Sequence, residues 1–102
     1  MRKIIAVDFD GTLVENKWPK IGKMKKDVVK RLYDEIFDEK AYVIIWTCRS
    51  GTQLQEMQDW LVENKVYFDR INANAPWIID QYGRDNRKIY ADEYWDDKAV
   101  LI

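Results

Sequence analysis

The chain has 102 residues, of which 47% are hydrophobic and 14% aromatic, so it can bury one core and is too apolar to be disordered. Its net charge of −1 provides no general attraction for polyanions or anionic membranes. It contains no histidine and one cysteine, which excludes Ser-His and Cys-His nucleophile pairs, internal disulfides and multi-cysteine zinc sites. Any catalysis must therefore use carboxylates, hydroxyls, lysines and arginines.

The first half of the chain alternates predicted strands and helices. Residues 3–7 are an apolar run typical of a strand buried on both faces, and residues 11–22 lose periodicity and predict a flap-like loop. Apolar residues at three- and four-residue spacing predict a helix over 24–37. Residues 42–46 predict a second strand, and 50–64 a second helix that begins with a capping box.

The second half continues this alternation more weakly. We expect strands at 66–71 and 89–95, a short helix at 77–82 and a last short strand at 99–102. The whole pattern predicts a single domain over 1–102, an α/β fold with a three-layer, Rossmann-like parallel sheet and helices on both faces. No stretch approaches the roughly 20 apolar residues of a membrane span, and acids interrupt the first apolar run too early for a signal peptide. We therefore expect a cytoplasmic protein without membrane contact.

Acidic and hydroxyl residues directly follow three of the apolar runs. Asp8 and Asp10 follow the first, Thr47 follows the second, and Asp96 and Asp97 follow a later one. Ligands bind parallel sheets at the carboxyl ends of the strands, and neighbouring strands would bring all five residues to one edge. The sequence therefore places a candidate site there.

The two acids after the first strand point to a metal. Asp8 and Asp10 lie two residues apart at a strand end, where like charges repel unless a cation intervenes. Carboxylates, a backbone carbonyl and a substrate phosphate are the ligands that Mg²⁺ prefers. Gly11 permits a sharp turn after the pair, and Thr12 can hydrogen-bond back into it. An isolated Asp-Gly is usually only a turn, but a second acid pair after another strand favours the metal site.

These segments resemble the haloacid dehalogenase superfamily. Asp8-Phe9-Asp10-Gly11-Thr12-Leu13 is similar to its first motif, in which D-x-D-G-T follows the first strand. Ile44-Ile45-Trp46-Thr47 resembles the second motif, and Tyr94-Trp95-Asp96-Asp97 the fourth. The resemblance spans nearly the whole chain, and the intervals between motifs leave no room for a cap domain.

The resemblance implies a Mg²⁺-dependent phosphatase that works through an aspartyl-phosphate. Asp8 would attack phosphorus, and Asp10 would protonate the leaving oxygen and later deprotonate water. Thr47 would hold a phosphoryl oxygen. Mg²⁺ would be held by Asp8, the Asp10 carbonyl and Asp96, with Asp97 as a further ligand or an outer-shell group.

The third motif departs from the superfamily pattern. Its lysine normally stands further upstream of the final acids than Lys88 does, although compact members show a similar spacing. Lys88 is therefore the candidate for the cation that neutralises the phosphoryl group, and Lys65 and Lys98 remain alternatives. Five lysines between residues 17 and 26 form either a solvated face or a positive funnel over the site.

The substrate class follows from the same resemblance. Arg49, two residues after Thr47, resembles an arginine in members that act on nucleotides and polynucleotide ends, so it is expected to bind a substrate phosphate, although a surface arginine is the alternative. Capless members act on large or exposed phosphates or use a neighbouring subunit of a homo-oligomer as a lid. We therefore expect a phosphorylated small molecule or a nucleic-acid end, with a nucleotide or 3′-phosphate favoured. The alternatives are a non-catalytic Mg²⁺- or phosphate-binding module and a phosphotransferase.

Overall fold

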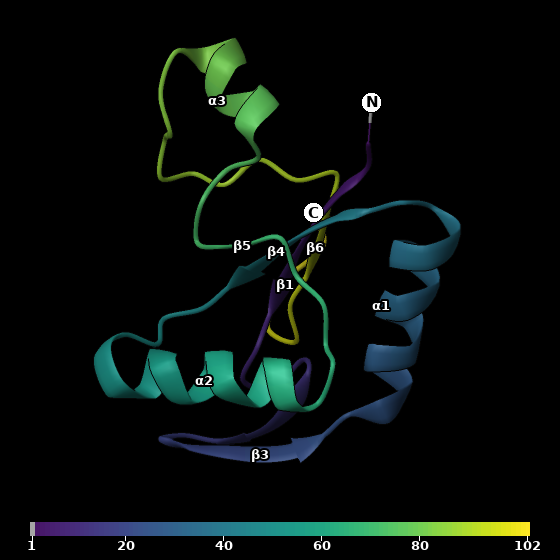
Figure 1. Ribbon diagram of the computed structural model, residues 1–102, viewed down its shortest axis with the longest axis vertical. Helices are drawn as coiled ribbons and strands as arrows, with labels where there is room; N and C mark the ends of the chain where they lie inside the picture. The colour runs from purple at the N-terminus through teal and green to yellow at the C-terminus, as the bar shows by residue number, and fades with distance from the viewer. Residues whose placement is uncertain (1) are drawn as a thin grey trace.

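A four-stranded parallel sheet is the centre of the computed structural model, which describes residues 2–102 (Figure 1). The sheet has the strand order β5-β4-β1-β6, and a separate antiparallel hairpin consists of β2 and β3. The elements are β1 (Ile4–Asp8), β2 (Val14–Lys17), β3 (Lys20–Met24), α1 (Lys26–Asp38), β4 (Tyr42–Trp46), α2 (Gly51–Glu63), β5 (Arg70–Ile71), α3 (Pro76–Tyr82) and β6 (Glu93–Trp95).

The sheet is buried on both faces because alternate residues of its strands point to opposite sides. Val7 and Ile45 pack with Leu32 of α1 and Met57 of α2 on one face. The opposite face packs against α3 and the chain before β6, through buried residues that include Ile4, Ala6, Ile44, Ile78 and Ile89. The predicted layers, a parallel sheet with helices on both faces, are therefore confirmed.

The predicted flap-like loop over 11–22 is instead a β-hairpin. Val14 pairs with Met24 and Lys17 with Lys20, and the register shifts between Val14 and Asn16. Figure 1 shows this hairpin at the end of the sheet away from α3. The tight turn after Lys17 and the buried Val14 side chain favour pairing over a loop. The sequence predicts that the first helix begins at Met24, but Met24 belongs to β3, and the helix begins at Lys26.

Four further predictions differ in detail. The weak strand predicted over 66–71 is only Arg70–Ile71, the strand over 89–95 is only Glu93–Trp95, and the final strand over 99–102 is not formed. Ser50 is the N-cap of α2, but its side chain makes no capping hydrogen bond. Short strands suffice here because each needs to pair only with one neighbour at the edge of the sheet.

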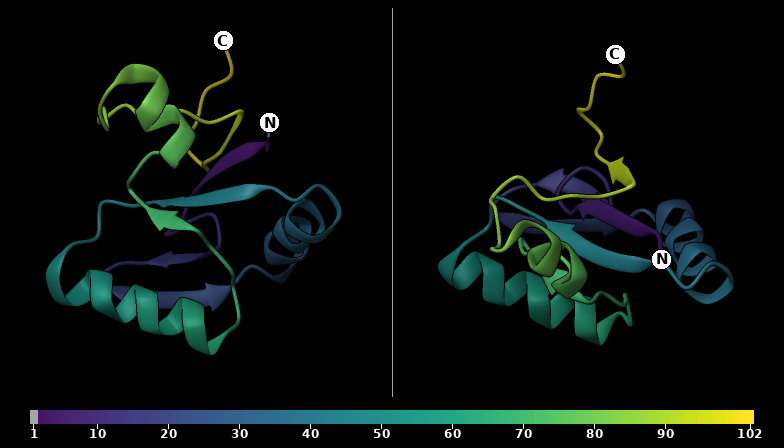
Figure 2. Two further views of the ribbon diagram at one scale, coloured as in Figure 1. Left: turned by 45° about the horizontal axis from the view of Figure 1, so that its top comes forward. Right: turned by 90° about the horizontal axis from the view of Figure 1, so that it is seen from above.

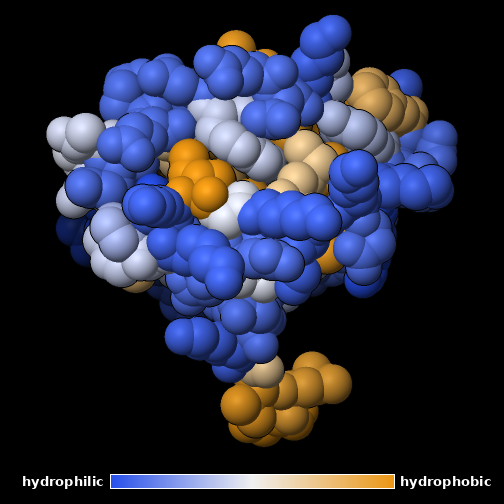
Figure 3. Space-filling view, turned by 90° about the horizontal axis from the view of Figure 1, so that it is seen from below, coloured by the Kyte–Doolittle hydropathy of each residue, from blue (hydrophilic) through white to orange (hydrophobic). Residues whose placement is uncertain are grey.

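The last residues run away from the body of the protein (Figure 2). Val100, Leu101 and Ile102 are exposed, and Figure 3 shows an apolar projection from an otherwise mainly hydrophilic face. None of the helices within residues 2–102 has the length and hydropathy that crossing a membrane requires.

Candidate metal and phosphate site

The strand order places the predicted acids at a topological switch point. From β1 the chain moves outward to β4 and β5, and then returns to β6 on the other side of β1. Crevices at such points, outside the carboxyl ends of the strands, are the usual ligand sites of α/β sheets. Asp8 ends β1, and Asp96 and Asp97 directly follow β6.

Three carboxylates meet at this edge. Oxygen atoms of Asp8, Asp96 and Asp97 all lie within 4.8 Å of one another. Within residues 2–102, no lysine or arginine forms an ion pair with any of the three. The half-buried position of Asp8, followed by the charge of Asp96, raises the pKa of the Asp8 carboxyl to about 6. The cluster therefore holds excess negative charge that an added cation would stabilise.

The turn after β1 brings the first and last acids together. The Thr12 hydroxyl lies 3.3 Å from Oδ2 of Asp8 and 3.4 Å from Oδ1 of Asp97, and it accepts the Asp97 N–H at 3.0 Å. Gly11 has a φ of +95°, and a Cβ at this position would lie 2.5 Å from Oδ2 of Asp97. Glycine is thus required both for the turn and for the close approach of Asp97. The predicted hydrogen bond of Thr12 into the turn is present.

Asp10 is directed away from the three acids. Its carboxylate accepts two hydrogen bonds from Arg49, at 2.8 Å from Nε and 2.7 Å from Nη2. The Arg49 side chain is only 1% exposed, and the Asp10 side chain is 17% exposed. This bidentate geometry is typical of strong, oriented arginine–carboxylate pairs.

Arg49 also ties the hairpin to the sheet. Its guanidinium donates to the carbonyl oxygens of Pro19 and Lys20, and it lies 5.1 Å from the centre of the exposed Trp18 ring. The sequence suggested a substrate phosphate as the partner of this arginine. The structure instead gives its guanidinium partners within the protein, because the hairpin folds over it.

Thr47 follows β4 at the same edge and is buried. Its backbone is held by Asn72, whose side chain accepts the Thr47 N–H at 2.9 Å and donates to the Thr47 carbonyl at 2.8 Å. The Thr47 hydroxyl accepts the Arg49 N–H at 3.0 Å. Asn72 was not singled out from the sequence, although its place directly after β5 is the same signal that identified Thr47 after β4.

The three candidate lysines lie in three different places. Lys88 is exposed and borders a cavity that none of the three acids lines. That cavity shares only Tyr94 with the cavity of Asp8 and Asp96. Lys98 directly follows Asp97, and Lys65 lies between α2 and β5, at the opposite edge of the sheet. Lys25, noted in the sequence only as one of the hairpin lysines, donates to the Gly11 carbonyl at 3.0 Å. Lys25 therefore steadies the turn that carries the acids.

The donor set fits a hard divalent cation. Three carboxylates without a basic partner, at the carboxyl edge of a parallel sheet, match the oxygen ligands that Mg²⁺ takes together with waters or a phosphate. The Asp10 carboxylate lies outside this set because Arg49 holds it. A contribution from the backbone carbonyl of Asp10 stays a prediction.

Comparison with known proteins gives one informative match. No family model matches the chain, and no curated protein does. A conserved protein from Bacteroides thetaiotaomicron, whose structure is solved, is 33% identical, with a TM-score of 0.81 over 98% of this chain and 79% of that protein. At this identity and coverage, the chain belongs to the same family as the conserved Bacteroides protein.

Proposed function

We propose that this protein is a Mg²⁺-dependent phosphomonoesterase of the haloacid dehalogenase superfamily, with Asp8 as its nucleophile. The observation that carries the proposal is the convergence of Asp8, Asp96 and Asp97 within 4.8 Å beside the buried Thr47. Three acids held together by a glycine turn are costly to the apoprotein, as the raised pKa of Asp8 indicates. A bound cation offsets that cost.

The proposed reaction has two steps. An Asp8 carboxylate oxygen attacks phosphorus, the bond to the leaving oxygen breaks, and Asp10 gives that oxygen its proton. Water then attacks phosphorus, Asp10 takes a proton back, and the Asp8–phosphorus bond breaks to release phosphate. Because Arg49 occupies both oxygens of Asp10, Asp10 must exchange one of these hydrogen bonds for the leaving group. Arg49 is then a positioning residue for the acid.

The remaining groups would stabilise charge on the phosphoryl oxygens. Asp8, Asp96, Asp97 and the Asp10 carbonyl would hold Mg²⁺, which supplies Lewis-acid stabilisation of negative charge when bound. Thr47 would donate to a phosphoryl oxygen, its backbone fixed by Asn72. We retain Lys88 as the candidate cation, and its cavity shares Tyr94 with the cavity of Asp8 and Asp96.

The substrate is proposed to be a nucleotide or a nucleic-acid 3′-phosphate. Between Asp8 and Thr47 the chain forms only the hairpin, α1 and β4, and we infer that the site has no cap domain. An uncapped site admits a large or polymeric phosphate ester, unless a neighbouring subunit covers it.

The proposal is tested by phosphate release from an aryl phosphate. We expect slow, Mg²⁺-dependent turnover that EDTA abolishes and that Asp8→Asn reduces to background. Asp38→Asn changes an exposed acid at the end of α1 and serves as the matched control. Turnover that survives EDTA, or that survives in Asp8→Asn, would contradict the proposal.

A further inference from the structure

The face of the sheet that carries Asp8 has an open aromatic groove. Asp8 lies on the same face as Ala6, two residues earlier in β1. Asp8 pairs with Trp46 of β4, and Ala6 pairs with Tyr94 of β6. These residues, with Trp95 and Asp96, line the acid cavity, which has a volume of about 160 Å³. The Trp46 and Tyr94 rings are exposed and meet edge to face, with centres 5.9 Å apart.

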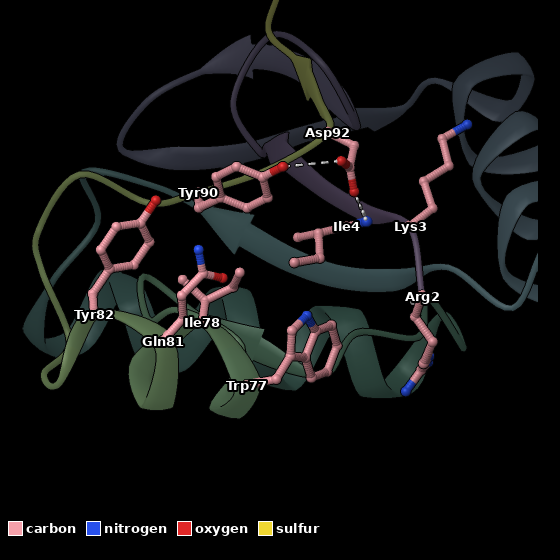
Figure 4. Close-up of a pocket in the computed structure, with 9 residues that line it drawn as sticks. All are labelled: Arg2, Lys3, Ile4, Trp77, Ile78, Gln81, Tyr82, Tyr90 and Asp92. Atoms are coloured by element: carbon pink, nitrogen blue, oxygen red, sulfur yellow. Dashed lines mark hydrogen bonds between the residues drawn. The ribbon is translucent and has the colours of Figure 1, made fainter.

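The groove continues away from the acids. Tyr94 also borders a second cavity of about 390 Å³, the tyrosine cavity, whose walls include Tyr82, Arg84, Lys88 and Tyr90. Tyr82 and Tyr90 in turn border a third cavity near the start of β1 (Figure 4). Tyr94 is therefore common to the first two cavities, Tyr82 and Tyr90 are common to the second and third, and Arg84 and Lys88 lie on the wall of the second.

The walls of this groove are fixed by the protein. Buried Asn74 donates to Asp85 at 2.9 Å and to the Asn86 carbonyl at 2.7 Å, and it accepts the Tyr90 N–H at 2.8 Å. The Tyr94 hydroxyl hydrogen-bonds the backbone at Ile89. These contacts hold the segment between α3 and β6 in place. The Tyr90 and Tyr94 rings are therefore already positioned, and a ligand that binds them loses little entropy in ordering them.

The third cavity contains a donor without a partner. The Trp77 indole N–H is buried and makes no hydrogen bond within residues 2–102, and Figure 4 shows it turned toward the side chains that line the cavity. A buried donor left unpaired is costly to the fold, and solvent does not reach this nitrogen, so we assign it no role in the groove.

We propose that this groove binds single-stranded nucleic acid that carries a terminal phosphate, with the phosphate at Asp8 and the adjoining base against Tyr94 and Trp46. The inference rests on the proposed phosphatase function. Aromatic side chains combined with cationic ones are the usual means of binding single strands without reading sequence. From Asp8 back to Ile4 the strand spans about 13 Å. At roughly 3.4 Å per stacked nucleotide, this length exceeds one nucleotide.

The test compares kcat/KM for a short phosphorylated single-stranded oligodeoxynucleotide, the matching nucleoside monophosphate and an aryl phosphate. The oligonucleotide is offered with its phosphate at the 3′ or the 5′ end. We expect at least one oligonucleotide to exceed the mononucleotide roughly tenfold, the order of one base–aromatic stack. Equal values for the oligonucleotides and the mononucleotide would overturn the inference.

Variants of the groove separate binding from a general loss of folding. Tyr82→Ala and Arg84→Ala should each lower the ratio of oligonucleotide to aryl phosphate kcat/KM several-fold, and Arg84→Ala should also weaken its salt dependence. Tyr67→Ala removes a similarly exposed tyrosine outside the groove and should leave the ratio unchanged. Unchanged ratios in both groove variants would overturn the inference.

Binding distinguishes this inference from the proposed function. Fluorescence anisotropy of the labelled phosphorylated oligonucleotide is measured with Asp8→Asn, which cannot turn it over if the proposed function is correct. Aryl phosphate hydrolysis without oligonucleotide binding would contradict nucleic-acid binding by the groove and would still support the proposed phosphatase function. Oligonucleotide binding that Tyr82→Ala weakens, without phosphate release by the wild type, would support the groove and contradict the phosphatase.

Discussion

Arg49→Ala is expected to lower the free energy of unfolding by about 3 kcal/mol. Removing one member of a buried ion pair typically costs roughly 3–5 kcal/mol, because the other charge stays buried without a partner. The Asp10 side chain is 17% exposed, so water can partly replace the lost guanidinium. We therefore expect a cost at the lower end of this range. The variant also loses the hydrogen bonds of the guanidinium to the carbonyls of Pro19 and Lys20.

This loss is measured by urea unfolding followed through tryptophan fluorescence. The midpoint should fall while the denaturant slope stays constant, and thermal unfolding should shift down by about 12–20 °C for a chain of this size. Arg49→Lys keeps the charge but cannot bind both oxygens of Asp10, so it should lie between Arg49→Ala and the wild type.

Lys30→Ala is the control because it removes an ion pair that solvent reaches. Lys30 lies 3.6 Å from Asp34 on α1, and the two side chains are 79% and 60% exposed. This variant should change stability by no more than about 0.5 kcal/mol. An Arg49→Ala loss as small as that of Lys30→Ala would refute the view that Arg49 clamps Asp10 and the hairpin.

Three further predictions concern the acid site. In metal-free protein, the contribution of Asp8 to stability should fall as pH rises from about 4 to 6, because Asp8 keeps its proton to about pH 6 when folded but only to about 3.8 when unfolded. Asp8→Asn should remove this slope in denaturation series at several pH values, and an unchanged slope would contradict the assignment. Gly11→Ala should displace Asp97 and weaken Mg²⁺ binding by calorimetry, because its Cβ would overlap that carboxylate; wild-type affinity would refute this. Lys88→Ala should lower kcat roughly 10²–10³-fold at saturating Mg²⁺, and a near-normal kcat beside a collapse in Lys98→Ala would transfer the role to Lys98.

The layers of the fold and the edge at which the acids meet could be predicted from local patterns in the chain. Apolar runs followed by Asp8, by Thr47 and by Asp96 locate three strand ends, and parallel strands bring such ends to one edge of the sheet. The turn after β1 could also be predicted, because Gly11 and Thr12 directly follow the acids and their interactions span only a few residues. Local periodicity and short-range turn chemistry are sufficient for these features.

The partner of Arg49 depends on long-range packing and could not be predicted from the sequence. The guanidinium meets Asp10 across 39 positions of the chain and meets the hairpin turn at Lys20, and no local pattern encodes either contact. The hairpin itself forms because Val14 becomes buried against the rest of the fold, which overrides the loop-like composition of its sequence. Packing of the folded chain decides which polar side chain forms a hydrogen bond with a group that is distant in sequence. The sequence alone offers many donors and acceptors that could form the same bond.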